Sequence, residues 1–169
     1  ICSEYIMSKL NELYEFMLSN MCIRYKQTQE SLENIMDRIA YHESHGDPKC
    51  KQFGGGPGRG LFQFEEGMSE GGETAMNRLL RWFNKNSRLA PQWTTINFNG
   101  VDASRLEPKA QKMLFMANVR YHPKASFKGL DNDKLPEWWA KYHWAGPDSQ
   151  KAERLESFDD SMEVYERIN

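Results

Sequence analysis

Residues 39–64 read IAYHESHGDPKCKQFGGGPGRGLFQF, and the rest of the chain is organised around this stretch. It joins the charged end of a predicted helix to a glycine-rich loop and then to a short aromatic run. Residues 54–60 contain five glycines and one proline, a composition typical of an irregular loop with exposed backbone. A phosphate-binding loop is not predicted, because no Lys-Ser or Lys-Thr pair follows the glycines and no strand precedes them. The stretch is therefore a candidate active site.

The helix that leads into this stretch has one apolar face. Its apolar residues fall at i, i+3, i+4 and i+7, at Leu32, Ile35, Met36 and Ile39. Thr28 or Ser31 can cap its start, and Gly46 and Pro48 end it. Four residues beyond Ile39 the period reaches Glu43, which at about 100° per residue falls within about 20° of the apolar face. The sequence therefore predicts a carboxyl group on the buried side of the helix end.

Length and composition limit the class of protein. A chain of 169 residues is about one domain long, and 39% hydrophobic and 27% charged residues are ordinary globular values. A net charge of -2 predicts no nucleic-acid partner. No apolar run is long enough for membrane insertion, and we expect this chain to carry no signal peptide of its own. Cys2, Cys22 and Cys50 lack metal-ligand spacing and are interpreted as free thiols, so neither a metal nor a cofactor is predicted.

Apolar periodicity predicts five further helices, over residues 3–26, 73–85, 108–122, 136–145 and 148–169. Asp148 or Ser149 can cap the last of them. Residues 91–105 show no helical period and could form a short strand or an extended flap. The expected fold is mainly α, with about six helices and at most a minor β element. The helix in residues 1–30 is expected to pack on a domain of residues 31–169, either as a core helix or as a docking helix for a larger assembly.

Glu43 is the leading candidate for chemistry. Burial raises the pKa of a carboxyl group because it disfavours the charged form. A carboxylic acid that stays protonated near neutral pH can protonate a glycosidic oxygen as its bond breaks. A solvated glutamate at a frayed helix end is the alternative interpretation.

Two other segments could line a sugar-binding cleft. In residues 58–66 the glycines let backbone approach a ligand and Gln63 offers an amide; a turn followed by a buried aromatic pair is the alternative. Residues 141–148 read KYHWAGPD, in which Tyr142 and its aromatic neighbours could stack on a sugar or belong to the core. His143 is interpreted as a polar neighbour and not as a metal ligand, because no second His or Cys stands at ligand spacing.

Four motifs, in this order, resemble the catalytic domain of soluble lytic transglycosylases and goose-type lysozymes, a superfamily that includes many bacteriophage wall-degrading domains. ESHGDPK in residues 43–49 is similar to the Glu-Ser motif of that family, and GLFQF in residues 60–64 to its Gly-Leu-Met-Gln motif. ANVRY in residues 117–121 lies where the family has an Asn-rich helix. YHWAGP in residues 142–147 is similar to its Tyr-Asn-Ala-Gly-Pro motif.

The resemblance implies a lysozyme-like fold and cleavage of the β-1,4 bond between N-acetylmuramic acid and N-acetylglucosamine in bacterial peptidoglycan. Glu43 would act as acid and then as base, without a second carboxylate, because the acetamido group of the substrate attacks its own anomeric carbon. Either the sugar's 6-hydroxyl or water would complete the reaction. The expected substrate-binding residues are Ser44, Phe62, Gln63, Phe64, Tyr142 and His143. This interpretation requires residues 39–64 and 142–147 to be adjacent in space.

The resemblance, together with the expected lack of an export signal and the long amino-terminal helix, leads to an expected place of action. We expect action at the bacterial cell wall or periplasm by a phage-derived protein, carried in the virion or made for lysis, whose first helix contacts other virion proteins. The alternatives are a non-catalytic virion or assembly domain that retains a lysozyme-like fold, and a chitin-directed hydrolase of the same superfamily.

Overall fold

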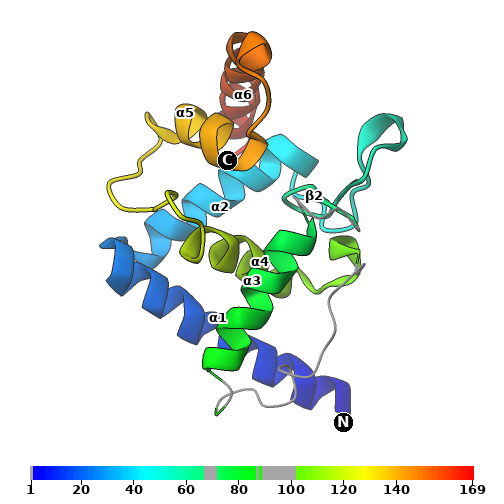
Figure 1. Cartoon of the computed structure of the whole chain (residues 1–169), viewed down its shortest axis with the longest axis vertical. Helices are drawn as coiled ribbons and strands as arrows, with labels where there is room; N and C mark the ends of the chain where they lie inside the picture. The colour runs from blue at the N-terminus through cyan, green and yellow to red at the C-terminus, as the bar shows by residue number, and fades with distance from the viewer. Residues whose placement is uncertain (1, 67–71, 87, 89–101) are drawn as a thin grey trace.

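The computed structural model describes residues 2–66, 72–86, 88 and 102–169 (Figure 1). Within these residues the fold is mainly α, and the predicted fold class is confirmed. The helices are α1 (Cys2–Tyr25), α2 (Gln29–Ser44), α3 (Gly72–Lys85), α4 (Pro108–Arg120), α5 (Leu135–Trp139) and α6 (Asp148–Ile168). The minor β element is an antiparallel pair of two-residue strands, β1 (Gly58–Arg59) and β2 (Phe64–Glu65), in which Gly58 pairs with Glu65.

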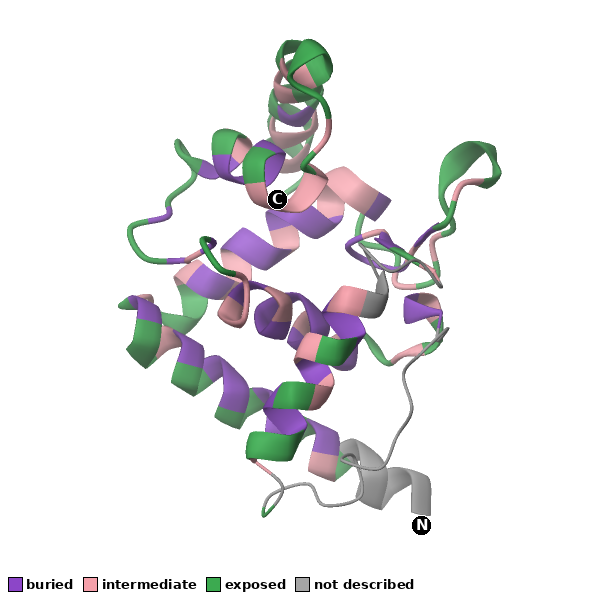
Figure 2. Cartoon of the chain, viewed as in Figure 1, coloured by how far each residue is buried: buried purple, intermediate pink, exposed green. Residues whose placement is uncertain are grey.

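The core is built around α4, which packs against both α1 and α3. Figure 2 shows buried positions on the inner faces of α1, α2 and α4, and exposed positions on the outer sides of α1 and α6. The buried residues of α4 occupy most of its length, at Ala110, Gln111, Met113, Leu114, Phe115, Met116, Ala117 and Val119. Because α4 contacts neighbours on several sides, it needs apolar residues around most of its circumference.

Helix α1 contributes its apolar stripe to this same core. Its buried side chains are Leu10, Leu13, Tyr14, Met17, Leu18, Met21 and Tyr25. Glu33 of α2 accepts hydrogen bonds from the Tyr14 hydroxyl group and, at 2.7 Å, from Lys112 of α4. Burial and the bond from Tyr14 to Glu33 raise the pKa of Tyr14, which stays a neutral donor. This contact ties α1, α2 and α4 together.

Both predicted capping residues act at the start of α2. The Thr28 hydroxyl accepts a hydrogen bond from the backbone of Ser31, and the Ser31 hydroxyl accepts one from the backbone of Thr28, which together form a capping box. At the other end the helix closes on His45, whose φ of 55° is left-handed. The polypeptide then turns through Gly46 into the glycine-rich loop. The last turn of α2 thus faces the loop that follows it.

Gln111 holds that loop in place from inside the core. Its side-chain oxygen accepts a hydrogen bond from the backbone of Leu61 at 2.7 Å, and its amide nitrogen donates to the carbonyls of Pro48 and Leu106 at 2.9 Å each. Gly60, with φ of 79°, passes so close that a β-carbon there would lie 2.3 Å from the Gln111 oxygen. The apolar period correctly predicted the helix α4, but it gave no sign that Gln111 would be a buried hydrogen-bonding residue.

Three local details differ from the sequence predictions. The predicted helix over 136–145 is α5 followed by a π-helical turn, Ala140–Trp144, which ends at Ala145 with φ of 53°. At the start of α6 the N-cap is Pro147, and Asp148 is already the first helical residue, so neither Asp148 nor Ser149 caps the helix. Most of residues 91–105 lies outside the described residues, and Ala103–Arg105 form a short 3-10 helix.

Candidate active site

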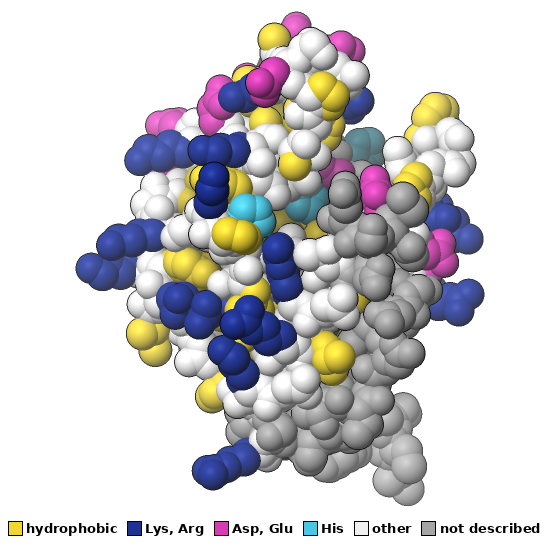
Figure 3. Space-filling view, in the orientation of Figure 1, with side chains coloured by type: hydrophobic (Ala, Val, Ile, Leu, Met, Phe, Trp, Pro, Cys, Tyr) yellow, Lys and Arg dark blue, Asp and Glu magenta, His cyan; other side chains and the backbone are white. Residues whose placement is uncertain are grey.

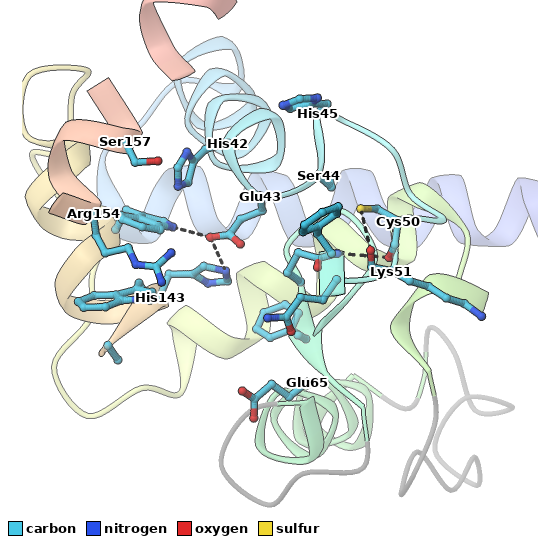
Figure 4. Close-up of a pocket in the computed structure, with 17 residues that line it drawn as sticks. His42, Glu43, Ser44, His45, Cys50, Lys51, Glu65, His143, Arg154 and Ser157 are labelled. Carbon is cyan, nitrogen blue, oxygen red and sulfur yellow. Dashed lines mark hydrogen bonds and ion pairs between the residues drawn. The ribbon is translucent and has the colours of Figure 1, made fainter. Parts of the chain in front are cut away.

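A cleft of about 1000 Å³ opens between the end of α2, the glycine-rich loop and the segment that joins α5 to α6 (Figure 4). Its lining comes from residues 42–45, 50–53 and 63–65, from Trp139 and residues 143–145, and from Arg154 and Ser157 of α6. The two motif segments that had to be adjacent, residues 39–64 and 142–147, do meet here. The contact is direct, since the His143 ring nitrogen Nε2 lies 2.7 Å from the carbonyl oxygen of Phe62.

Glu43 lies in this cleft, on the last turn of α2. Its side chain is 17% exposed, and its oxygen Oε1 accepts a hydrogen bond of 2.8 Å from the indole nitrogen of Trp139. The Trp139 side chain is buried and stacks on Trp144 at a centroid distance of 6.3 Å. A rigid aromatic donor therefore fixes the direction in which this carboxyl group points.

His143 approaches the same carboxyl oxygen from the other side. A carbonyl oxygen can only accept, so the bond to Phe62 requires a proton on Nε2 of His143. That nitrogen lies 4.0 Å from Oε1 of Glu43, and the His143 side chain is 9% exposed. The carbonyl of Phe62 thus determines which nitrogen of His143 carries the proton and how the imidazole ring is oriented.

The protonation of Glu43 results from opposing effects. Burial raises its pKa above the ordinary glutamate value, while charge on His143, the Trp139 hydrogen bond and the Arg154 guanidinium act in the opposite direction. The effect of burial is the largest, so the pKa stays raised. A carboxyl group in this balance can hold a proton at higher pH than usual and can still become a carboxylate near the Arg154 guanidinium.

His42, which the sequence reasoning did not select, packs directly behind this arrangement. Burial lowers its pKa to about 4, helped by the charges of His143, Arg154 and His45, so the ring is neutral at neutral pH. Its Nδ1 lies 2.8 Å from the Ser161 hydroxyl oxygen, and its ring meets Trp139 edge-on at 4.6 Å. His42 therefore supports the residue that orients Glu43.

The polar groups of Ser44 and Gln63 already have partners inside the protein. The Ser44 hydroxyl group lies 2.9 Å from the carbonyl oxygen of Ala40 and 2.8 Å from that of Leu61, and it can donate to either. The amide nitrogen of Gln63 donates to the carbonyls of Cys50 and Gly60. Both residues line the cleft, but in this arrangement their donors hold its wall, and the carbonyl oxygen of the Gln63 amide has no hydrogen-bond donor among the described residues.

The predicted aromatic residues separate into three environments. The Phe62 ring is 1% exposed and stacks on Phe115 at 4.5 Å, so only its backbone carbonyl reaches the site. Phe64 lines the cleft and contacts the His143 ring edge-on at 5.4 Å. Tyr142 lies apart from the residues that line the cleft, against Trp138 and His122. The structure therefore brings Phe64 to Glu43, and not the Phe62 ring or Tyr142.

The π-helical turn accounts for the position of Tyr142. In a π-helical turn the hydrogen bond joins residues five apart, one more than in an α-helix. Here the amide of Ala145 donates to the carbonyl of Ala140 at 3.0 Å. Both Trp139 and His143 face Glu43, and Tyr142 is directed elsewhere. Trp139 and His143 are four residues apart, a spacing that could have indicated a shared face.

Two further residues of the cleft were missed. Arg154 extends from α6 into the cleft, with its guanidinium 5.7 Å from the Trp144 ring centroid. Phe53, at the tip of the glycine-rich loop, is fully exposed at the edge of the cleft. No local pattern marks either residue, because one belongs to an otherwise ordinary helix and the other to an irregular loop.

Comparison with protein-family models, with curated proteins and with solved structures gives no match for this chain. The described residues contain no group of three or more His, Cys, Asp or Glu side chains placed to hold a metal ion. None of the helices in the described ranges is long and apolar enough to cross a bilayer. Cys22 and Cys50 are free thiols.

Proposed function

We propose that this protein cleaves the glycan strands of bacterial peptidoglycan, with Glu43 as the general acid and base. The observation that carries the proposal is a single carboxyl group with a raised pKa, held by Trp139 and flanked by His143 in a cleft of about 1000 Å³. A cleft of this volume is large enough for part of a sugar chain. The lysozyme-like family is proposed from the ordered motifs alone.

In the proposed reaction Glu43 donates its proton to the glycosidic oxygen as the bond to the anomeric carbon breaks. The acetamido oxygen of the substrate forms a new bond to that carbon and balances the leaving electron pair. Glu43, now a carboxylate, accepts a proton from the 6-hydroxyl group or from water, whose oxygen then displaces the acetamido oxygen. Only one protein carboxylate is needed, in contrast to the usual pair.

The surroundings of Glu43 suit both halves of this cycle. Burial favours the acid form needed for the first step. Arg154 and the Trp139 hydrogen bond favour the carboxylate needed for the second. Phe53, which is fully exposed, offers aromatic surface at the cleft on which the apolar face of a sugar ring can stack.

The decisive experiment compares clearing of purified cell walls by the wild type, by Glu43→Gln and by Glu65→Gln. Glu65 also lines the cleft but lies on an exposed position of β2, so it is the matched control. We expect Glu43→Gln to lose roughly 10²–10⁴-fold in rate and Glu65→Gln to stay close to wild type. Equal clearing by wild type and Glu43→Gln would remove Glu43 from the mechanism. Mass spectrometry of the released fragments separates anhydro from reducing ends.

A non-catalytic virion or assembly domain is the second candidate, and specific observations favour it. Tyr142 lies outside the cleft, and Ser44 and Gln63 use their donors internally. If the protein is such a domain, neither the wild type nor Glu43→Gln should clear cell walls.

Under the leading proposal the protein acts at the cell wall or periplasm and derives from a phage, as a virion component or a lysis enzyme.

A further inference from the structure

Several cations converge on Tyr121, away from the residues that line the cleft. The Arg81 guanidinium lies 4.3 Å from the Tyr121 ring centroid, that of Arg120 lies at 5.0 Å, and the Lys85 ammonium lies at 5.5 Å. Arg24 at the end of α1 is close enough for its charge to act on the Tyr121 hydroxyl group. We call these five residues the Tyr121 cluster. Its cations come from α1, α3 and the end of α4.

No acidic side chain compensates the cluster among the described residues. The ion pairs of the described chain involve other cations, and no carboxylate lies within 4.0 Å of Arg24, Arg81, Lys85 or Arg120. Tyr121 itself does not supply a negative charge, since burial raises the pKa of its hydroxyl group despite the nearby cations. Among the described residues, no carboxylate therefore neutralises the positive charge of the cluster.

Attraction between cations and an aromatic ring explains only part of this arrangement. A tyrosine ring attracts a cation on each face, yet four cations from three helices also repel one another. Figure 3 shows Lys and Arg side chains gathered beside α3, while the acidic side chains in the same view lie around α6 and at the right edge. A group of cations therefore lies together on this face of a protein whose net charge is only -2.

We propose that the Tyr121 cluster binds a compact, multiply charged phosphate anion of the oligophosphate class. Guanidinium and ammonium groups are the usual partners of phosphate oxygens, and Arg can bind them with two parallel hydrogen bonds. The cations surround one ring and do not follow a line, so they match a compact anion better than the extended phosphate track of a nucleic-acid duplex. His122, the next residue along the chain, contacts Tyr142 at 5.5 Å and places the cluster behind the π-helical turn of the cleft.

The test measures binding of tripolyphosphate by isothermal titration calorimetry at low salt, without any glycan substrate. The variant is Arg81→Gln with Lys85→Gln, two exposed residues of α3. Because the variant removes two cations that could each donate a charge-assisted hydrogen bond, we expect it to weaken tripolyphosphate binding by roughly a hundredfold or more. The control is Lys49→Gln with Arg105→Gln, which removes one Lys and one Arg from exposed positions elsewhere and should bind as wild type does.

Three outcomes would overturn the proposal. One is the absence of saturable tripolyphosphate binding by the wild type, and another is equal weakening in both double variants, which would reflect overall charge. The third is binding of duplex DNA that is lost in the Arg81 and Lys85 variant without any binding of tripolyphosphate. Circular dichroism of each variant checks that it is folded. The binding experiment does not involve cleavage of peptidoglycan. A failure to bind tripolyphosphate would therefore leave the proposed glycan cleavage untouched, and a failure to clear cell walls would leave the proposed anion site untouched.

Discussion

Among single residues, Glu43 and His42 are neighbours in sequence whose pKa values are shifted in opposite directions by the same cause. Burial raises the pKa of Glu43 and lowers that of His42 to about 4, so in both cases it favours the neutral form. Trp139 contacts both residues: its indole nitrogen donates a hydrogen bond to Glu43, and its ring packs against His42. The chemistry of the cleft therefore depends on a buried, mostly uncharged environment behind the carboxyl group.

His42 predicts how stability depends on pH. A histidine with a folded pKa of about 4 binds its proton less readily in the folded state than in the unfolded state, where the value is about 6.5. The stability that it contributes is fully present above about pH 6.5 and is lost as the pH falls towards 4. We expect urea unfolding of the wild type to show this loss.

The matched variant is His42→Asn, which keeps a polar group near Ser161 but does not titrate. Its free energy of unfolding should change less between pH 7 and pH 4.5 than that of the wild type. His45→Asn, at an exposed position, serves as the control and should retain most of the wild-type dependence, because His45 is the smallest of the named causes that lower the pKa of His42. A His42→Asn protein with unchanged pH dependence would show that another group is responsible.

At the scale of elements, the glycine-rich loop is positioned by α4. Gly60 has φ of 79° and lies where any β-carbon would meet the Gln111 oxygen at 2.3 Å. That oxygen is also the acceptor for the backbone of Leu61, whose own carbonyl is bound by Ser44. Two buried side chains, one from α4 and one from α2, thus determine where the loop begins its return towards the cleft.

Gly60→Ala should therefore disturb the loop more than its backbone conformation alone requires. We expect a loss of roughly 2 kcal/mol or more in the free energy of unfolding, from the left-handed conformation together with the displaced hydrogen bond. Gly129→Ala separates the two causes, because Gly129 has φ of 70° but no atom within 4 Å of its β-carbon position. Urea denaturation of both variants measures the difference. Equal losses would mean that the contact with Gln111 contributes nothing.

At the scale of the whole molecule, α1 is continuous with the core. Met17 and Leu13 are at most 1% exposed, and Tyr14 connects to α4 through Glu33 and Lys112. Gln27, directly after α1, donates from its side-chain amide to the carbonyls of Phe127 and Leu130. The division into a helix of residues 1–30 and a domain of residues 31–169 stays a prediction that deletion can test.

Deletion of residues 1–27 should leave a chain that does not fold cooperatively, because it exposes the apolar surface that α1 covers on α4. The measurement is thermal unfolding followed by circular dichroism. Met17→Ala gives an intermediate case and should lower the free energy of unfolding by about 2–5 kcal/mol, whereas Ile23→Ala, at a position that is 79% exposed, should not. A shortened chain with an unchanged melting temperature would make α1 an appended helix.

The sequence by itself determined the helices, because a 3.6-residue apolar period and local caps are properties of neighbouring residues. It located all six helices, the small size of the β element and the glycine-rich turn, and it directed attention to Glu43. It also led us to expect that residues 39–64 and 142–147 meet, and they do. The helices and the turn depend on neighbouring residues, whereas the contact between the two segments was expected only from the resemblance of the ordered motifs.

Only the tertiary structure decided what surrounds Glu43. Trp139, His42 and Arg154 reach the cleft from different helices, and Gln111 supports it from the core. Within the π-helical turn His143 reaches Glu43, while Tyr142 packs against Trp138 and His122; the four-residue spacing from Trp139 is compatible with the first position, and only the packing shows the second. Contacts between residues about a hundred positions apart leave no local pattern, so the partners that orient Glu43 could not be predicted from the sequence, although its burial was.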